Sequence, residues 1–134
     1  MMSMVHDNVI RAYSVDFEAE TLNMNTVYIT DYVHENTDVV FTGYLTHSFD
    51  CVMRGSIIFD ILEYPSELFF KNEAVLLEEK KPFGWPISYE TKSELIEYLQ
   101  THEYKIFEIS SSLGLCGLVF AKQMEIIVND EGAR

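Results

Sequence analysis

The segment VIRAYSVDFEAE, residues 9–20, decides how the chain folds. Apolar side chains recur at alternate positions along it, and polar ones stand between them from Ser14 onward. The apolar positions are Val9, Tyr13, Val15, Phe17 and Ala19, and the polar ones are Ser14, Asp16, Glu18 and Glu20. Successive side chains of a strand point to opposite faces of the sheet. This period of two therefore predicts a half-buried strand over residues 9–20.

The residues that follow predict a hairpin and further strands. Thr21-Leu22-Asn23 allows a turn, and Met24 to Thr30 is rich in Thr, Val, Tyr and Ile, which favour strands. Two more strands are predicted before residue 65, at Val39–Leu45 and Ser56–Leu62. Two others are predicted late in the chain, at Lys105–Ser110 and at Leu118–Val128 with a bend near Lys122.

Two helices are predicted between these groups of strands. Ser66 is placed to cap the first helix, which runs to about Lys80 and is stopped by Pro82. Thr91 and Glu94 have the spacing of a capping box, so the second helix runs from there to Thr101 or His102. The resulting order predicts an α+β fold: a largely antiparallel sheet of about six strands, with two helices between strands 4 and 5 that pack on one face.

The length of 134 residues predicts a single globular domain, residues 1–134, with flexible ends at residues 1–7 and 129–134. A chain of this size can bury about two-thirds of its unfolded surface, so it needs no disulfide framework. Cys51 and Cys116 are therefore predicted to be reduced thiols. No secretory signal and no apolar run of about 18 residues is present, so we expect a cytoplasmic protein that does not enter a membrane.

The charge balance excludes one class of partner. The chain has 9 Lys and Arg against 22 Asp and Glu, a net charge of −13, so nucleic acid is not an expected partner. Asp16, Glu18 and Glu20 would project from one face of the predicted strand as a row of carboxylates. Like charges placed in this way repel, which indicates a basic protein partner that neutralises them. The alternative is a solvated sheet face that serves solubility.

Signals for catalysis are few, and the main one lies in a short segment. His47, Asp50 and Cys51 bring an imidazole, a carboxylate and a thiol close together, and a neighbouring His can activate a Cys nucleophile. A small hydrolase-like enzyme with a pocket near His47 and Cys51 is one interpretation. The other is a loop His beside an inert Cys. The His residues are scattered without metal-ligand spacing, so neither a metal site nor a cofactor is expected.

Trp85 is the remaining candidate for partner binding. It is the only Trp of the chain and lies in KPFGWPI, residues 81–87, between the predicted helices. Aromatic residues in such a segment can anchor a partner. The alternative is that Trp85 seals one end of the core, with its indole N–H bonded to the backbone.

Several phrases of the sequence together carry a resemblance. They are Asp38–Leu45 (DVVFTGYL) with His47 and Phe49, Ile58–Ile61, Gly84-Trp85-Pro86 and Ser111–Leu115. With these phrases the chain resembles small acidic bacterial proteins, and in size and acidity it is similar to the immunity proteins that neutralise polymorphic bacterial toxins. The resemblance implies a bacterial cytoplasmic protein and transfers no catalytic residue.

These observations lead to three hypotheses about function. The first is an acidic protein-binding module, such as an immunity-type inhibitor, that covers a basic partner through Asp16, Glu18 and Glu20 with Trp85 as an anchor. The second is the small enzyme at His47 and Cys51. The third is a structural homo-oligomer that associates through an apolar sheet face. An exposed patch of carboxylates favours the first, and a cleft in which His47 meets Cys51 favours the second.

Overall fold

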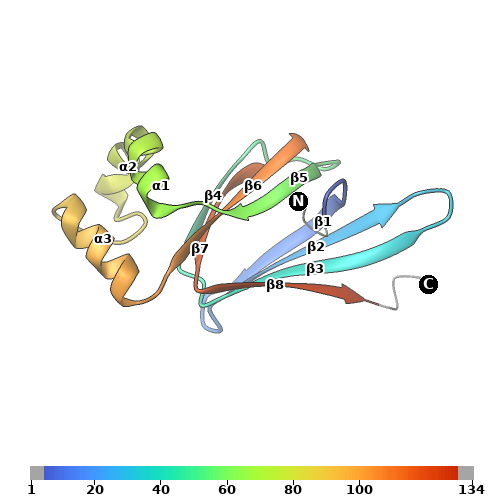
Figure 1. Cartoon of the computed structure of the whole chain (residues 1–134), viewed down its shortest axis with the longest axis horizontal. Helices are drawn as coiled ribbons and strands as arrows, with labels where there is room; N and C mark the ends of the chain where they lie inside the picture. Colours follow the sequence, from blue (N-terminus) through green and yellow to red (C-terminus); the bar gives the residue numbers. More distant parts are fainter. Residues whose placement is uncertain (1–4, 130–134) are drawn as a thin grey trace.

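The described part of the chain, residues 5–129 of a computed structural model, is mostly β-structure (Figure 1). Within it, eight strands form one antiparallel sheet in the order β4-β7-β6-β5-β1-β2-β3-β8. The strands are β1 (Val9–Asp16), β2 (Thr21–Ile29), β3 (His34–Thr42), β4 (Thr46–Asp50), β5 (Ile57–Glu63), β6 (Lys105–Leu113), β7 (Cys116–Ala121) and β8 (Gln123–Asn129). Between β5 and β6 lie α1 (Ser66–Asn72), α2 (Ala74–Lys80), the 3-10 turn η1 (Lys81–Phe83) and α3 (Lys92–Thr101).

The expected α+β fold with about six strands and two helices between strands 4 and 5 is wrong. The residues described form eight strands, and the three short helices follow the fifth strand. Two local features account for the difference. The segment 46–50 is the short strand β4 rather than a loop, and the expected strand 118–128 is divided at Lys122 into β7 and β8.

The extra strand β4 and the split between β7 and β8 both arise at one corner of the sheet. The chain bends between β3 and β4 at Gly43, and between β7 and β8 at Lys122, and the two bends lie against each other. The Lys122 N–H donates to the Thr42 carbonyl at 2.9 Å. Gly43 has a φ of +63°, and a Cβ at this position would lie 2.7 Å from the Lys122 Cβ. Only glycine allows both the left-handed backbone and the close approach.

The corner divides the sheet into two halves that enclose the first core cluster. One half is β1-β2-β3-β8 and the other is β4-β7-β6-β5, and Figure 1 shows the two groups of strands spread apart at an angle. Leu22 and Phe41 from the first half pack with Phe107 and Val119 from the second. The rings of Phe41 and Phe107 have centroids 5.5 Å apart. Because the chain bends between β3 and β4 and again between β7 and β8, the sheet wraps around a common apolar interior.

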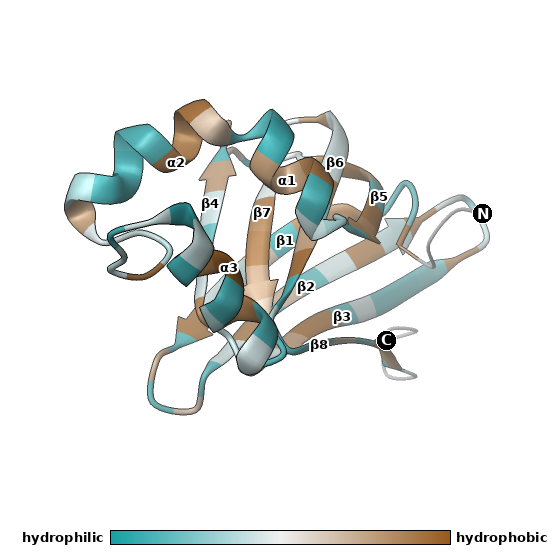
Figure 2. Ribbon diagram, turned by 60° about the vertical axis from the view of Figure 1, so that its left-hand side comes forward, coloured by the Kyte–Doolittle hydropathy of each residue, from teal (hydrophilic) through white to brown (hydrophobic). Residues whose placement is uncertain are grey.

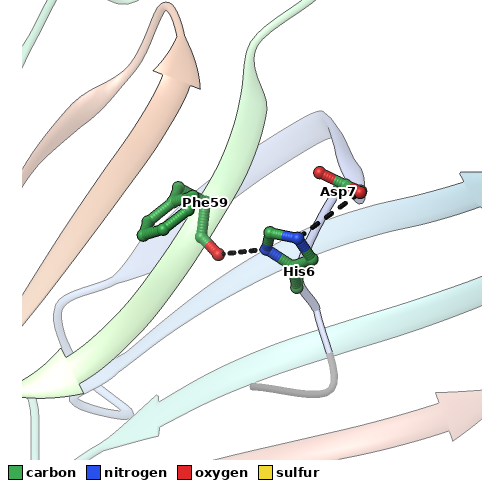
Figure 3. Close-up of polar contacts among 3 residues, drawn as sticks. All are labelled: His6, Asp7 and Phe59. Atoms are coloured by element: carbon green, nitrogen blue, oxygen red, sulfur yellow. Dashed lines mark hydrogen bonds and ion pairs between the residues drawn. The ribbon is translucent and has the colours of Figure 1, made fainter. Parts of the chain in front are cut away.

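The N-terminal segment joins the two halves where β1 meets β5. The ladder between these strands contains one residue pair, Val9 with Ile57. Just before it, the Asp7 N–H donates to the Ile58 carbonyl at 2.8 Å, and His6 Nδ1 lies 2.7 Å from the Phe59 carbonyl oxygen (Figure 3). These bonds supply the pairing that the short ladder lacks.

The helices cover the outer face of β6 and β7 (Figure 2). Phe69, Leu95 and Leu99 from the helices pack there against Leu118 and Phe120 from β7. Since the inner face of β7 lines the first core, Leu118–Ala121 is buried on both sides. A strand buried on both faces needs no alternation of polar and apolar residues, which explains the continuous apolar sequence of this segment.

The local predictions have mixed outcomes. The hairpin within residues 9–30 is confirmed as β1 and β2, but its turn lies at residues 17–20, and the expected turn at Thr21-Leu22-Asn23 is wrong because these residues belong to β2. The helices lie within residues 66–102 as expected. Thr91 is confirmed as the N-cap of α3, because its hydroxyl accepts from the Glu94 N–H at 3.2 Å, whereas the reciprocal bond of a capping box does not form among the described residues. The cap at Ser66 is wrong: Pro65 occupies the cap position, and the expected helix is interrupted at Glu73.

Parts of the expected flexible ends lie outside the described residues, namely 1–4 and 130–134. Within residues 1–7, Val5 is fully buried in the first core cluster. At the other end, Asn129 pairs with Asn36 as the last residue of β8. No helix within residues 5–129 has the length and apolar character needed to cross a membrane.

Candidate functional site

The predicted row of carboxylates is replaced by a turn. Strand β1 ends at Asp16, and residues 17–20 form the turn that leads into β2, the blue loop at the bottom of Figure 1. Asp16 Oδ1 accepts from the backbone N–H groups of Glu18 and Ala19, each at 3.0 Å. Asp16 is thus the acceptor that shapes the turn, so the expectation that the three carboxylates alternate along one strand face is wrong.

The turn nevertheless keeps its acidic side chains in solvent. All five residues of this acidic turn, which we define as residues 16–20, are exposed. Asp16, Glu18 and Glu20 form no ion pair with any residue between 5 and 129. The negative charge of the turn is therefore not neutralised within the described part of the molecule.

An aromatic residue that was not predicted as a site residue lies at the centre of the acidic turn. Phe17 is 76% exposed, although it was expected to face the core as part of a strand. Its ring is 6.2 Å from the ring of Tyr44, which belongs to the corner after β3. The alternating pattern continues to Ala19, and nothing in it marks the end of the strand at Asp16. The turn thus exposes an aromatic ring beside three solvent-exposed carboxylates.

Trp85 lies in the helix layer and not in the acidic turn. Its ring packs edge-on against Phe120, with centroids 5.4 Å apart, and Lys80 Nζ lies 5.8 Å from its centroid. Trp85 is therefore partly buried against a second core cluster, formed by apolar residues of the helices with Ile106, Leu118 and Phe120 of the sheet. The expected bond from its indole N–H to the backbone is absent: this N–H is buried and has no acceptor within residues 5–129.

His47 is held in an aromatic environment on β4. It is half-buried, and its Nδ1 lies 2.7 Å from the hydroxyl of Tyr44. The rings of Phe49 and Tyr13 are 4.6 Å and 6.1 Å from its own. Burial lowers the pKa of His47, so these surroundings favour the neutral imidazole. His47, Asp50 and Cys51 all belong to the described part of the chain, and no hydrogen bond joins His47 to either of the other two.

Asp50 lines a cavity that does not contain His47 or Cys51. This cavity, of about 370 Å³, lies between the outer face of β4, β7 and β6 and the junction of α1 with α2. Asp50 shares it with Glu73, Glu108 and Cys116. Cys51 is exposed and follows the end of β4 with a φ of +54°. His47 and Asp50 thus lie on opposite faces of β4, so the structure does not bring the imidazole, the carboxylate and the thiol together in one site.

The thiol in this cavity is not activated. Burial raises the pKa of Cys116, and the neighbouring Cys51 and carboxylates Asp50 and Glu108 raise it further. A nucleophilic Cys needs the opposite environment, with a cation or a helix N-terminus that stabilises the thiolate. Both cysteines are free thiols in the structure. The geometry therefore gives no support to a Cys–His mechanism.

A metal site is not formed by the described residues either. Residues 5–129 contain no group of three or more His, Cys, Asp or Glu side chains that could hold a metal ion. Comparison with known proteins adds no further assignment. No protein-family model matches the chain, and no curated protein or solved structure matches it.

Proposed function

We propose that the chain is an acidic protein-binding module that covers a basic surface of another protein. The observation that carries this proposal is the acidic turn: Phe17 is 76% exposed among Asp16, Glu18 and Glu20, and none of these carboxylates is neutralised by a described residue. Burial of an aromatic side chain supplies affinity, whereas surrounding charges supply selectivity for the partner.

The two kinds of side chain have separate roles in this mechanism. The carboxylates attract a basic partner through a field that is screened over about 8 Å at physiological ionic strength. They therefore act mainly on the rate of association. Phe17 acts after contact, when its exposed ring is removed from water in a pocket of the partner, so it acts mainly on the rate of dissociation.

The resemblance to immunity proteins supports a narrower version of the same function. In that version the module is a bacterial, cytoplasmic inhibitor, and its partner is a basic toxin or a basic nucleic-acid enzyme. The net charge of −13 supports it, because an inhibitor of a nucleic-acid enzyme would present negative charge where the substrate backbone binds.

Capture from a bacterial lysate with three tagged proteins tests the proposal. They are the wild type, the turn variant D16N/E18Q/E20Q and the control E67Q/E79Q/E97Q, whose three residues are exposed on the helices. We expect one basic protein to bind the wild type and the control and to be lost from the turn variant. Equal capture by all three proteins, or no specific capture by any, contradicts the proposal.

The captured partner then allows the two roles to be separated. The turn variant should associate more slowly and show a flatter dependence of its association rate on salt. Phe17→Ser should chiefly raise the dissociation rate, by about tenfold or more. Phe83→Ser is the matched control because Phe83 is 86% exposed and lies in η1. Identical salt slopes for wild type and turn variant exclude the electrostatic mechanism.

A further inference from the structure

A groove on the helix layer has apolar walls and two lysines at its rim. It lies between α2 and the start of α3 and has a volume of about 210 Å³. Phe70, Leu77 and Leu95 line it and are at most 7% exposed. The groove is distinct from the acidic turn and from the cavity beside Asp50, since none of its lining residues belongs to either.

The lysines at this groove are held close to its aromatic side chains. Lys81 Nζ lies 5.0 Å from the ring centroid of Tyr89 and donates to the Glu90 carbonyl at 2.9 Å. Lys92 Nζ lies 6.0 Å from the ring of Phe70 and has no hydrogen bond or ion pair with any described residue. An ammonium group has three N–H donors. Two therefore remain on Lys81 and three on Lys92 for another acceptor.

The local charge is opposite to that of the whole chain. Glu78 also lines the groove, so the lining has two ammonium groups against one carboxylate. The chain as a whole has a net charge of −13 and repels anions. Lys92 is also the first residue of α3, where the positive end of the helix dipole favours a negative group. A carboxylate is thus favoured in this groove.

The size and the walls of the groove restrict the rest of the ligand. An apolar cavity of about 150 Å³ is large enough for benzene. A groove of about 210 Å³ can therefore hold one six-membered ring and a short chain. Small-molecule sites commonly combine apolar walls with a few polar groups that fix orientation.

We propose that this groove binds a small carboxylate with a cyclic apolar body. The ring lies against Phe70, Leu77 and Leu95, and the carboxylate accepts from Lys81 and Lys92. This site is separate from the acidic turn, and the proposal does not depend on the proposed protein-binding function.

Titration of the full chain with 4-phenylbutyrate, followed by amide chemical shifts in NMR spectra, tests the proposal. We expect saturable shifts centred on Leu77 and Leu95, with a dissociation constant of about 1 mM for a probe of this size. The neutral analogue 4-phenylbutanol should bind about tenfold more weakly. No saturable shift at up to about ten times the expected dissociation constant overturns the proposal, and so does equal affinity for the alcohol.

Two variants with one matched control locate the binding. K81Q/K92Q should weaken 4-phenylbutyrate about tenfold or more, whereas K105Q/K122Q, with the same change in charge elsewhere, should stay within about twofold of the wild type. Ala74→Trp places a large side chain at an exposed lining position and should abolish binding in a folded protein. Unchanged affinity in K81Q/K92Q, or in a folded Ala74→Trp protein, overturns the proposed site.

Discussion

Replacing Gly43 with Ala should destabilise the protein much more than the same change at Gly55. Both glycines have positive φ, +63° and +82°. An added Cβ at Gly43 would lie 2.7 Å from the Lys122 Cβ, whereas at Gly55 no atom lies within 4 Å. Rotation of the Lys122 side chain cannot relieve the contact, since its Cβ is fixed to the backbone. The two substitutions thus share the backbone strain and differ in the clash at the corner.

The expected magnitudes follow from these two contributions. A left-handed backbone costs an Ala about 1–2 kcal/mol, and overpacking in a closely packed region costs about 1–3 kcal/mol. Gly55→Ala should therefore lower the free energy of unfolding by about 1–2 kcal/mol and Gly43→Ala by about 2–5 kcal/mol. For a chain of this length, each kcal/mol corresponds to about 3–5 °C in Tm.

Urea unfolding followed by circular dichroism measures the difference, and a third variant tests its cause. Lys122→Gly removes the atoms that the new Cβ would meet. In the Lys122→Gly background, Gly43→Ala should cost only about as much as Gly55→Ala does in the wild type. The reasoning about the corner is refuted if Gly43→Ala costs no more than Gly55→Ala, or if Lys122→Gly gives no relief.

Three further predictions concern single side chains. Burial lowers the pKa of His47, so the unfolded chain takes up a proton before the folded one as the pH falls below about 6.5. The free energy of unfolding should therefore decrease between pH 7.5 and pH 5.5, and it should decrease less in His47→Gln. Urea titrations at both pH values measure this difference. Burial and neighbouring charges raise the pKa of Cys116, so iodoacetamide should alkylate Cys116 in the Cys51→Ser protein more slowly than Cys51 in the Cys116→Ser protein. The double variant should still bind the captured partner. Phe120→Ala should cost about 3–5 kcal/mol in urea unfolding, since this fully buried ring contacts Phe69 and Trp85; a loss below about 1 kcal/mol would contradict the assigned packing.

The parts of the fold that could be predicted are those set by local patterns. The β1–β2 hairpin follows from alternation, and the start of α3 follows from the N-cap at Thr91. Strand β4 could not be found in this way, because all but its last residue are half-buried and its sequence THSFD shows no clear face. Its position depends on pairing with β7, a strand distant in sequence, which local propensity does not report.

The candidate site was predicted in part for a similar reason. The acidic residues of the turn were identified from the net charge and from the alternating positions of residues 9–20, both of which are visible in the sequence. The role of Phe17 depends on where β1 ends, and the alternating pattern continues past that point. The groove at Lys81 and Lys92 is lined by residues from α1, α2, η1 and α3, so no local motif marks it.

The corner that bends the sheet also positions the acidic turn. The Tyr44 N–H, next to Gly43, donates to the Glu20 carbonyl at 2.9 Å, and the Tyr44 ring faces both Phe17 and His47. Tyr44 is only 7% exposed, so it connects the exposed turn to the first core cluster. A turn held to the core in this way loses little conformational entropy when it binds, because its geometry is set before contact. Gly43, which allows the sheet to bend, thus also helps to fix the position of the turn that carries Phe17 in the proposed binding surface.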